Sequence, residues 1–390
     1  MPVVSLLELM RKAPGAEPAL AALEGEERLH VVGGAVRDAL LGRVPRELDF
    51  VVEGHAEPVA RRAARRLGGD VVVHDRFGTA IVRAPVAVFD IVSARSESYA
   101  VPGALPDIRT GATLEEDLAR RDFTVNTFAL RLADERLQSV EHAREDLDAG
   151  VLRVLHDRSF EDDPTRLLRL ARYVARLGFR PDPDTDALAA RATVDTVTGG
   201  RIGSELRLLL REHQPQALLA LERHGVGAAL LPGFAVDPRR VETALELYPK
   251  PIVGLAASVV GARGLAGRLD ELEFEAAARR AVVDAAARAP ALSERIGGLS
   301  DAELWRVLRG ERPETVAVAG ALGPAAAARR WLEDVRHRRL AITGDDFVAA
   351  GLSGPAVGEA LDAAQLAALN GEAPGAEEQL AAGLAAIRSS

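Results

Sequence analysis

The feature that most constrains the fold is a change of pattern near Asp157. Before this residue, short runs rich in Val, Ile and Phe alternate with Gly, Pro and Asp turns, as in β-strands. After it, apolar residues recur at helical spacing and strand signals nearly vanish. The sequence therefore predicts an α+β protein, in which a small mixed sheet with helices precedes an all-helical remainder.

Within the first part, residues 30–54 read as a strand, a glycine turn, a helix, a loop and a second strand. An amphipathic helix with a basic outer face is predicted over 56–67. Three β-branched runs within 70–93 predict antiparallel strands added to the first two, with turns at Arg76–Gly78 and Ala84-Pro85.

The segment that follows has a different composition. Residues 97–113 have the Pro and Gly content of a mobile loop. A short helix is predicted over 114–121, and short strands over 137–141 and 151–155 close this part of the chain.

The second part is predicted as separate helices with breaks at Gly and Pro positions, Pro290 among them. No fixed repeat period supports a solenoid. The predicted helices are 164–177, 185–193, 201–212, 215–225, 238–247, 253–264, 271–288, 301–310, 314–334, 344–350 and pieces of 355–385.

The composition excludes several classes of protein. The 390 residues include no cysteine, which excludes disulfides, thiol catalysis and cysteine-ligated zinc. No apolar run approaches about 18 residues, and no signal sequence is visible, so we expect no membrane span and a cytoplasmic location. The net charge of −9 argues against nonspecific coating of nucleic acid but allows a local basic groove.

Gly33 and Gly34 follow the first predicted strand. A pair of glycines also fits a plain tight connection between a strand and a helix. Arg37, one turn further on, favours a binding role, because its guanidinium can meet the same phosphate as the N–H groups of the turn.

Glu47 and Asp49 are two residues apart on the second predicted strand, so their side chains point the same way. Two adjacent carboxylates repel each other unless a cation lies between them. Such a pair is often a solvated edge, but the apolar residues around it predict a half-buried strand and favour binding of Mg²⁺. Asp90, on a neighbouring strand, either completes the acidic cluster or simply ends its strand.

Two further groups are candidates for nucleotide binding. Arg121, Asp122 and Asn126 belong to a run that is commonly a surface ion pair, yet near a phosphate site Arg121 can hold a triphosphate, and Asn126 can contact a ribose or orient Asp122. Asp163 and Arg166 open a long helix, for which an acid followed by Pro is a common start.

The register of this helix adds a second interpretation. At about 100° per residue, Asp163 and Arg166 flank the buried stripe, while Arg169 and Arg172 lie on a basic side that can face phosphates. A carboxylate and a guanidinium at such a border can read the hydrogen-bonding edge of a base.

The motifs GGAVRDALLG, RRDFTVNTFAL and DDPTRLLRLARYVARLGF, with the acidic strand after the first, resemble the class II tRNA nucleotidyltransferase/poly(A) polymerase family in order and spacing. GRIGSEL at 200–206 resembles the family's next motif. The resemblance covers about residues 29–212, and the helical remainder matches more loosely.

The resemblance implies a polymerase-β-like nucleotidyltransferase head in 1–157 and a neck with base-binding helices in 158–213. A helical body in 214–335 and a helical, tRNA-binding tail in 336–390 would follow. It also implies template-independent, two-metal transfer of CMP and AMP from CTP and ATP to the 3′ end of tRNA, whose acceptor arm is bound. The oligomeric state stays open between monomer and homodimer.

The resemblance also implies a role for each motif residue. Gly34 and Arg37 would hold the triphosphate; Glu47 and Asp49 would bind Mg²⁺; Arg121 and Asp122 would belong to the ribose and triphosphate motif; Asp163 and Arg166 would act as the amino-acid template for the base, supported by Arg169 and Arg172.

The sequence departs from the family pattern at three places. The first metal acid is normally Asp, whereas Glu47 is one methylene longer; the usual Glu-Asp of the template motif is Asp162-Asp163. The loop after Tyr99, implicated in the switch from C to A addition, lacks the basic cluster of many CCA-adding members. Therefore an A-adding or CC-adding enzyme, a poly(A) polymerase and a catalytically silent RNA-binding homologue stay open as alternatives.

Overall fold

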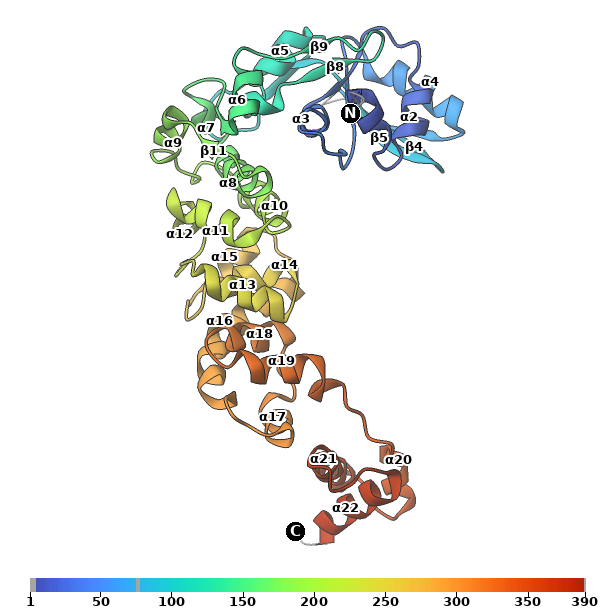
Figure 1. Cartoon of the computed structure of the whole chain (residues 1–390), viewed down its shortest axis with the longest axis vertical. Coiled ribbons are helices and arrows are strands. Elements are labelled where there is room, and N and C mark those ends of the chain that lie inside the picture. The colour runs from blue at the N-terminus through green and yellow to red at the C-terminus, as the bar shows by residue number, and fades with distance from the viewer. Residues whose placement is uncertain (1–4, 75–77, 389–390) are drawn as a thin grey trace. The chain divides into compact units, whose positions relative to one another are not determined.

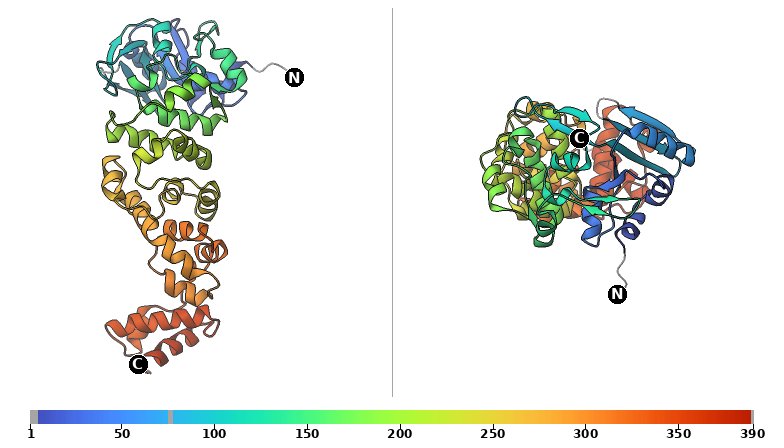
Figure 2. Two further views of the ribbon diagram at one scale, coloured as in Figure 1. Left: turned by 90° about the vertical axis from the view of Figure 1, so that its left-hand side faces the viewer. Right: turned by 90° about the horizontal axis from the view of Figure 1, so that it is seen from above.

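The computed structural model of the chain describes residues 5–74 and 78–388. The chain divides into two compact units, Met1–Thr198 and Gly199–Ser390. Every strand of the described residues belongs to the first unit, and the described elements of the second unit are helical (Figures 1 and 2). The predicted α+β architecture is confirmed. The division into head, neck, body and tail stays a prediction.

The first unit is built on a seven-stranded sheet in the order β3-β4-β5-β2-β1-β8-β9. Two smaller sheets pair β6 with β7 and β10 with β11. The strands are β1 (Leu29–Val32), β2 (Asp49–Val52), β3 (Asp70–His74), β4 (Thr79–Ala84), β5 (Ala87–Ser93), β6 (Arg95–Ser98), β7 (Asp107–Thr110), β8 (Ala129–Arg131), β9 (Leu137–Gln138), β10 (Val151–Leu152) and β11 (Arg180–Pro181).

The large sheet is mixed because β2 and β5 run parallel, whereas its other neighbouring strands are antiparallel. The predicted mixed sheet is confirmed, but the expected antiparallel addition of the strands within 70–93 is wrong at this pair. Helix α4 (Ala56–Leu67), confirmed at its predicted bounds, returns the chain across the sheet, so β3 runs in the direction of β2. The strand β5 then shares that direction as the third strand of a meander. The predicted turn Arg76–Gly78 lies outside the described residues except for Gly78.

The two faces of the sheet are covered by different helices. Helix α4 packs on β3, β4 and β5, and on this face the rings of Phe50 and Phe89 meet edge to face at 5.6 Å. On the other face, Val51 joins a buried cluster with Leu114 and Leu118 of helix α5 (Leu114–Ala119). Because side chains alternate along a strand, Asp49 lies on the α5 side.

The hairpin of β6 and β7 overlaps the segment predicted as a loop. Its register pairs Ser96 with Arg109, whose Nε donates to the Ser96 hydroxyl at 3.2 Å. The loop prediction is therefore wrong for residues 97–98 and 107–110, where cross-strand pairing orders the backbone, and residues 99–106 connect the two strands. The N–H of Gly103 in this connection donates to the carbonyl of Glu161 at 3.2 Å.

The remaining elements of the first unit are short, apart from one helix. Helix α8 (Thr165–Leu177) packs against α7, β10 and β11. The others are α1 (Leu6–Arg11), α2 (Ala16–Ala22), α3 (Gly34–Leu40), the 3₁₀ helix η2 (Thr124–Asn126), α6 (Ala143–Ala149), α7 (Ser159–Asp162) and α9 (Pro183–Ala189).

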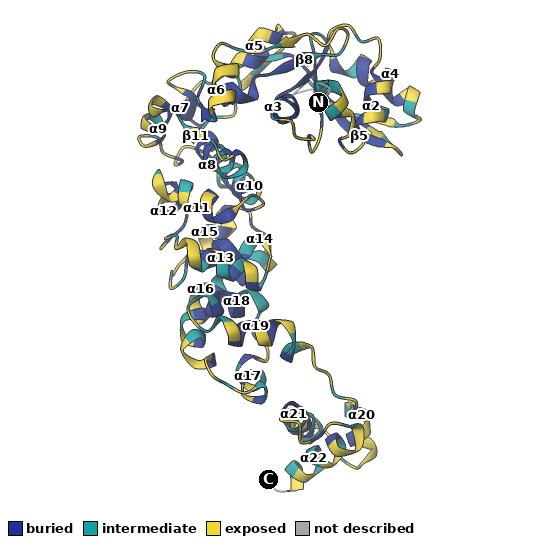
Figure 3. Cartoon of the chain, viewed as in Figure 1, coloured by how far each residue is buried: buried dark blue, intermediate teal, exposed yellow. Residues whose placement is uncertain are grey.

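The second unit is a succession of packed helices with buried inner faces and exposed outer ones (Figure 3). They are α10 (Gly199–Leu209), α11 (Gln214–Arg223), α12 (Val226–Leu230), α13 (Pro238–Leu247), α14 (Pro251–Ala257), α15 (Leu265–Glu271), α16 (Ala276–Ile296), α17 (Asp301–Leu308), α18 (Pro313–Ala321), α19 (Ala325–Glu333), the 3₁₀ helix η3 (Val335–His337), α20 (Gly344–Ala349), α21 (Pro355–Leu369) and α22 (Ala376–Arg388).

Several predicted helix boundaries are wrong in this unit, including the end of 253–264, since α14 stops at Ala257, and the start of 271–288, since α16 begins at Ala276. Helix α16 continues through Pro290, where a break was expected. Proline has no N–H to donate to the carbonyl of Ala286, but the N–H of Gly261 donates to that oxygen at 2.8 Å and replaces the missing bond. The single helix expected over 314–334 is divided into α18 and α19 at Gly323, whose φ is +156°.

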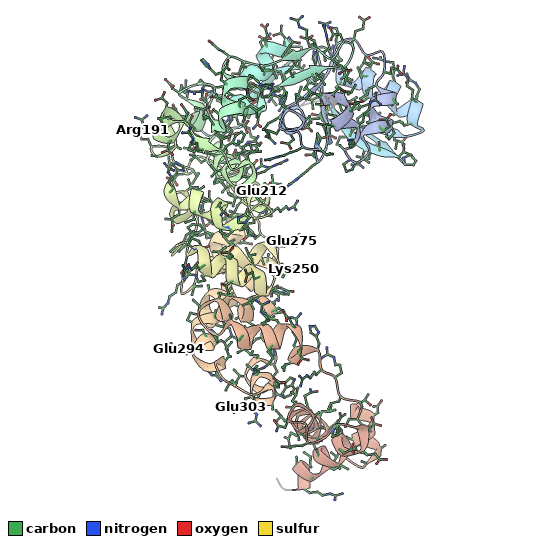
Figure 4. The ribbon with its side chains drawn as sticks, in the orientation of Figure 1. Arg191, Glu212, Lys250, Glu275, Glu294 and Glu303 are labelled. Carbon is green, nitrogen blue, oxygen red and sulfur yellow. The ribbon has the colours of Figure 1, made fainter. Side chains whose placement is uncertain are left out.

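The surface of the second unit carries part of the acidic surplus. Glu275, Glu294 and Glu303 are exposed on it (Figure 4). Within 5–74 and 78–388, no helix combines the length and the apolar character that crossing a membrane requires.

Candidate active site

The turn after β1 brings an arginine against a glycine. Gly33 has a φ of +69°, in the region that favours glycine, and its N–H donates to the carbonyl of Phe128 at 2.8 Å. A Cβ at position 33 would lie 2.8 Å from Nη1 of Arg121. The positive φ and this close approach both favour glycine at position 33, and the approach brings two predicted phosphate-binding groups together.

The strand register explains how the acidic residues meet beside this turn. Asp49 pairs with Val32, the last residue before Gly33. The parallel pairing of Phe50 with Ile91 sets Asp49 next to Asp90 on the neighbouring strand. Both side chains are exposed. The sheet thus brings Asp49 and Asp90 together at the glycine turn.

Glu47 is placed differently from the prediction. It precedes β2 and is exposed, whereas the sequence predicted that it would share the strand with Asp49. The reason is that pairing with β1 ends at Val32, since the turn at Gly33 leads the neighbouring chain away. Glu47 still lies near Asp49, because its negative charge contributes to the pKa of that carboxyl.

The pKa of Asp49 is raised above its ordinary value. The main cause is desolvation, because the carboxyl is solvent-accessible yet surrounded by protein; the charges of Glu47 and Asp90 raise the pKa further, and Arg121 opposes them. Such a carboxylate gains from a nearby cation. Carboxylate oxygens are also the donors that hard divalent ions prefer, so the side chains fit such an ion. In the described residues, no three His, Asp or Glu side chains are already gathered as a metal site.

Arg37 lies in the interior. Its side chain is 1% exposed, and its Nε and Nη2 donate to Oδ1 of Asp38 at 2.9 and 2.6 Å. Nη1 donates to Oδ1 of Asn126, and the guanidinium lies 5.4 Å from the ring centre of Tyr173. In this structure Arg37 joins α3, η2 and α8, and its contact with a triphosphate stays a prediction.

Asp122 and Asn126 complete a ring of polar contacts with α8. The Asn126 amide donates to Oδ1 of Asp122 at 2.9 Å, and Arg169 donates to Oδ2 through Nη2 at 2.6 Å and Nε at 2.8 Å. Two helical turns further along α8, Arg176 donates to Asp38 at 2.9 Å. The ring therefore fixes α8 against the elements that carry the glycine turn.

The electrostatics of Asp122 follow from these partners. Burial alone would raise the pKa of this carboxyl, but Arg169, the Asn126 amide and Arg166 hold it well below its ordinary value. Asp122 is thus a stable anion with its oxygens already occupied. Arg169 faces this carboxylate, and Arg172 lies 5.0 Å from the ring centre of Tyr173. Their roles toward a nucleotide stay predictions.

Asp163 lies just before α8, and Arg166 lies in its first turn. Oδ1 of Asp163 accepts from the Thr165 N–H at 3.1 Å and from its hydroxyl at 2.7 Å, as at a helix start. Arg166 is 4% exposed and donates to the Ser159 hydroxyl at 2.6 Å and to the Arg120 carbonyl at 2.8 Å. The predicted base-reading arginine therefore contacts the backbone next to Arg121.

Sequence reasoning missed three residues of this region. Asp38 bonds Arg37 and Arg176, Tyr173 is surrounded by guanidinium groups, and Asp117 bonds both Arg120 and Arg121. For Asp117 a signal was present, since acids three and four residues before arginines on a helix are neighbours of them. For Tyr173 none was available without the fold.

Comparison with known proteins places this geometry in a family. Residues 29–153 match the family model of the poly(A) polymerase head domain. The chain is 32% identical to an A-adding tRNA nucleotidyltransferase of Geobacter sulfurreducens, over 92% of this chain and 45% of that protein. It is 35% identical to a CC-adding tRNA nucleotidyltransferase of Deinococcus radiodurans, over 86% of this chain and 83% of that one.

A solved structure is similar over nearly the whole chain. The Thermotoga maritima CCA-adding enzyme complexed with tRNA-CCA has a TM-score of 0.79 and 26% identity, covering 98% of this chain and 97% of that one. The chain spans about half or less of the length of the first three curated relatives it matches. Its similarity to the Deinococcus protein extends over most of both chains, and the chain therefore belongs to the tRNA nucleotidyltransferase/poly(A) polymerase family, that of the CCA-adding enzymes.

Proposed function

We propose that this protein is a template-independent tRNA nucleotidyltransferase, which adds CMP and AMP from CTP and ATP to the 3′ end of tRNA. The observation that carries the proposal is the 2.8 Å bond from Arg166 to the carbonyl of Arg120. This bond joins the predicted base-reading helix to Arg120. The next residue, Arg121, lies against the glycine turn, and its charge acts on the nearby carboxyl of Asp49.

Nucleotidyltransferases of this family generally use a divalent metal ion. We propose that it is Mg²⁺, held by Glu47 and Asp49, with Asp90 completing the acidic cluster. When bound, the ion supplies activation of the attacking hydroxyl and stabilisation of the departing pyrophosphate. The raised pKa of Asp49 supports this assignment, because a cation would relieve the repulsion among these carboxylates.

The chain's own residues would orient both substrates. Gly33, Gly34 and Arg121 would receive the triphosphate, with Arg37, Asp122 and Asn126 behind them as a fixed frame. Asp163 and Arg166 would read the base.

The tRNA 3′ oxygen bonds to the α-phosphorus as pyrophosphate leaves, and the hydroxyl proton passes to the exposed carboxylate of Asp90. Recognition of the acceptor arm would rest on shape and backbone. We place the enzyme in the cytoplasm.

The relatives include enzymes named for A addition, CC addition and CCA addition, so the extent of addition needs a direct test. The experiment offers CTP, ATP and MgCl₂ with three tRNA transcripts, which end before the first C, after CC and after CCA. A CCA-adding enzyme completes the first two and leaves the third unchanged.

Other outcomes identify the alternatives. Extension of only the CC-ended transcript by a single A indicates an A-adding enzyme. Addition of only two C residues indicates a CC-adding one, and long A tails indicate a poly(A) polymerase. Binding of tRNA without any incorporation, at any Mg²⁺ concentration, contradicts the proposal and supports a silent RNA-binding homologue.

A further inference from the structure

Asp117 lies at the centre of a buried charge cluster between the acidic site and α8. Its side chain is 0% exposed on helix α5. Oδ1 accepts from Arg120 through Nε at 3.0 Å and Nη2 at 2.8 Å, and from the Arg95 N–H at 3.3 Å. Oδ2 accepts from Arg121 at 2.9 Å. One carboxylate therefore holds two consecutive arginines.

The two arginines lead to different parts of the site. The other terminal nitrogen of Arg121 lies against Gly33 and 3.4 Å from the Asn126 carbonyl, and its charge reaches Asp49. Arg120 points the other way, since Nη1 donates to Glu97 at 2.9 Å while its own carbonyl accepts from Arg166. Asp117 thus bonds both Arg121, which lies at the proposed triphosphate site, and Arg120, whose carbonyl supports the proposed base-reading Arg166.

The charges around Asp117 favour its ionised form. Burial would raise the pKa of this carboxyl, but Arg120 and Arg121 hold it below its ordinary value. A buried carboxylate of this kind is costly unless its partners are fixed around it. The same contacts that stabilise the anion therefore restrict both guanidinium groups to one arrangement.

We propose that Asp117 is a positioning residue, which sets Arg121 for the triphosphate and, through Arg120, sets Arg166 for the base. This inference rests on the proposed function. It predicts that a change at position 117 weakens nucleotide binding and base selection together. Because its side chain is fully buried, the carboxylate would touch neither substrate. Displacing a binding group by about 1 Å can cost roughly a hundredfold in rate.

The test compares Asp117→Asn with Asp146→Asn. Asp146 is a matched control in the same unit, because it is 4% exposed on a helix and accepts from Arg153 at 3.0 Å and from Thr124 at 2.7 Å. For each variant we would measure the unfolding midpoint, the KM for ATP and CTP on tRNA, the ratio of correct to UTP and GTP incorporation, and equilibrium binding of ATP.

Positioning predicts that Asp117→Asn raises the KM and the Kd for ATP by about tenfold or more and lowers base selection, while Asp146→Asn changes neither beyond about twofold. If both variants lose only stability or active fraction, with KM and selection unchanged, Asp117 is merely structural and the inference is overturned. Should Asp117→Asn fail to fold, Asp117→Glu keeps the charge but displaces both arginines, and a normal KM and selection there overturns the inference equally. A wild-type protein that never incorporates nucleotide contradicts the proposed function instead.

Discussion

The acids of the first unit form two groups with opposite surroundings. Asp49 and Asp90 are exposed, and within the described residues no hydrogen bond or ion pair reaches the Asp49 carboxylate, whose pKa is raised. Asp117 and Asp122 are buried, bonded by arginines, and have lowered pKa values. The comparison indicates that the first group is available to a ligand, whereas the second holds protein parts together.

The largest expected effect is on catalysis at the exposed group. Asp49→Ala removes a proposed metal-binding carboxylate, and loss of several kcal/mol of transition-state stabilisation lowers the rate by roughly a thousandfold or more. Single-nucleotide extension of tRNA with radiolabelled ATP measures this loss. Affinity for tRNA, measured by filter binding, should stay within about twofold. An active Asp49→Ala variant would show that the exposed acids are not the metal site.

The next effect is on folding at the buried group. Asp122→Ala leaves the half-buried Arg169 guanidinium and the buried Asn126 amide without their acceptor, and removing such a partner costs about 1–3 kcal/mol. Urea unfolding followed by circular dichroism measures the change. In contrast, Asp49→Ala should keep or increase the free energy of unfolding, because it removes a repelled charge. If Asp122→Ala and Asp49→Ala lowered the free energy of unfolding equally, the buried and the exposed acids would not differ in their contribution to stability.

A smaller effect is expected at Arg166, which is buried like the second group but proposed to contact substrate like the first. Arg166→Ala should relax discrimination against UTP and GTP by about tenfold, because the base edge loses a partner that rejects wrong patterns. Competition between labelled nucleotides on CC-ended tRNA measures the ratio. If only the overall rate falls and selectivity is unchanged, Arg166 belongs with the structural arginines.

The sequence allowed the glycine turn, the sheet of the first unit and most helix positions to be predicted, because each depends on local pattern. It did not show that Glu47 precedes the strand, since that depends on where β1 leaves the sheet. Nor did it show that α16 passes through Pro290, since the compensating N–H comes from Gly261 in a distant part of the sequence. In both cases the observed structure differs from the prediction because of a contact with a segment that is distant in the sequence.

The smallest expected effect is the pH dependence of stability, which has opposite sign in the two groups. The folded pKa of Asp49 is raised, so its destabilising contribution is absent below its unfolded value of about 3.8 and grows as pH rises through the folded pKa. Asp122 has a lowered folded pKa, so its stabilising contribution is complete above about 3.8 and is lost only as pH falls through that lowered pKa.

The two contributions can be separated by substitution. Metal-free unfolding curves from pH 3 to pH 7, for wild type and Asp49→Asn, should diverge as pH rises, with the variant becoming the more stable protein by about 1 kcal/mol or less, since the carboxyl is exposed. The curve of Asp122→Asn should diverge in the opposite direction. Its free energy of unfolding should fall furthest below that of wild type above pH 4. Parallel curves for Asp49→Asn and wild type would mean that Asp49 ionises as freely in the folded protein as in the unfolded chain, and that its neighbours do not prepare it for a cation.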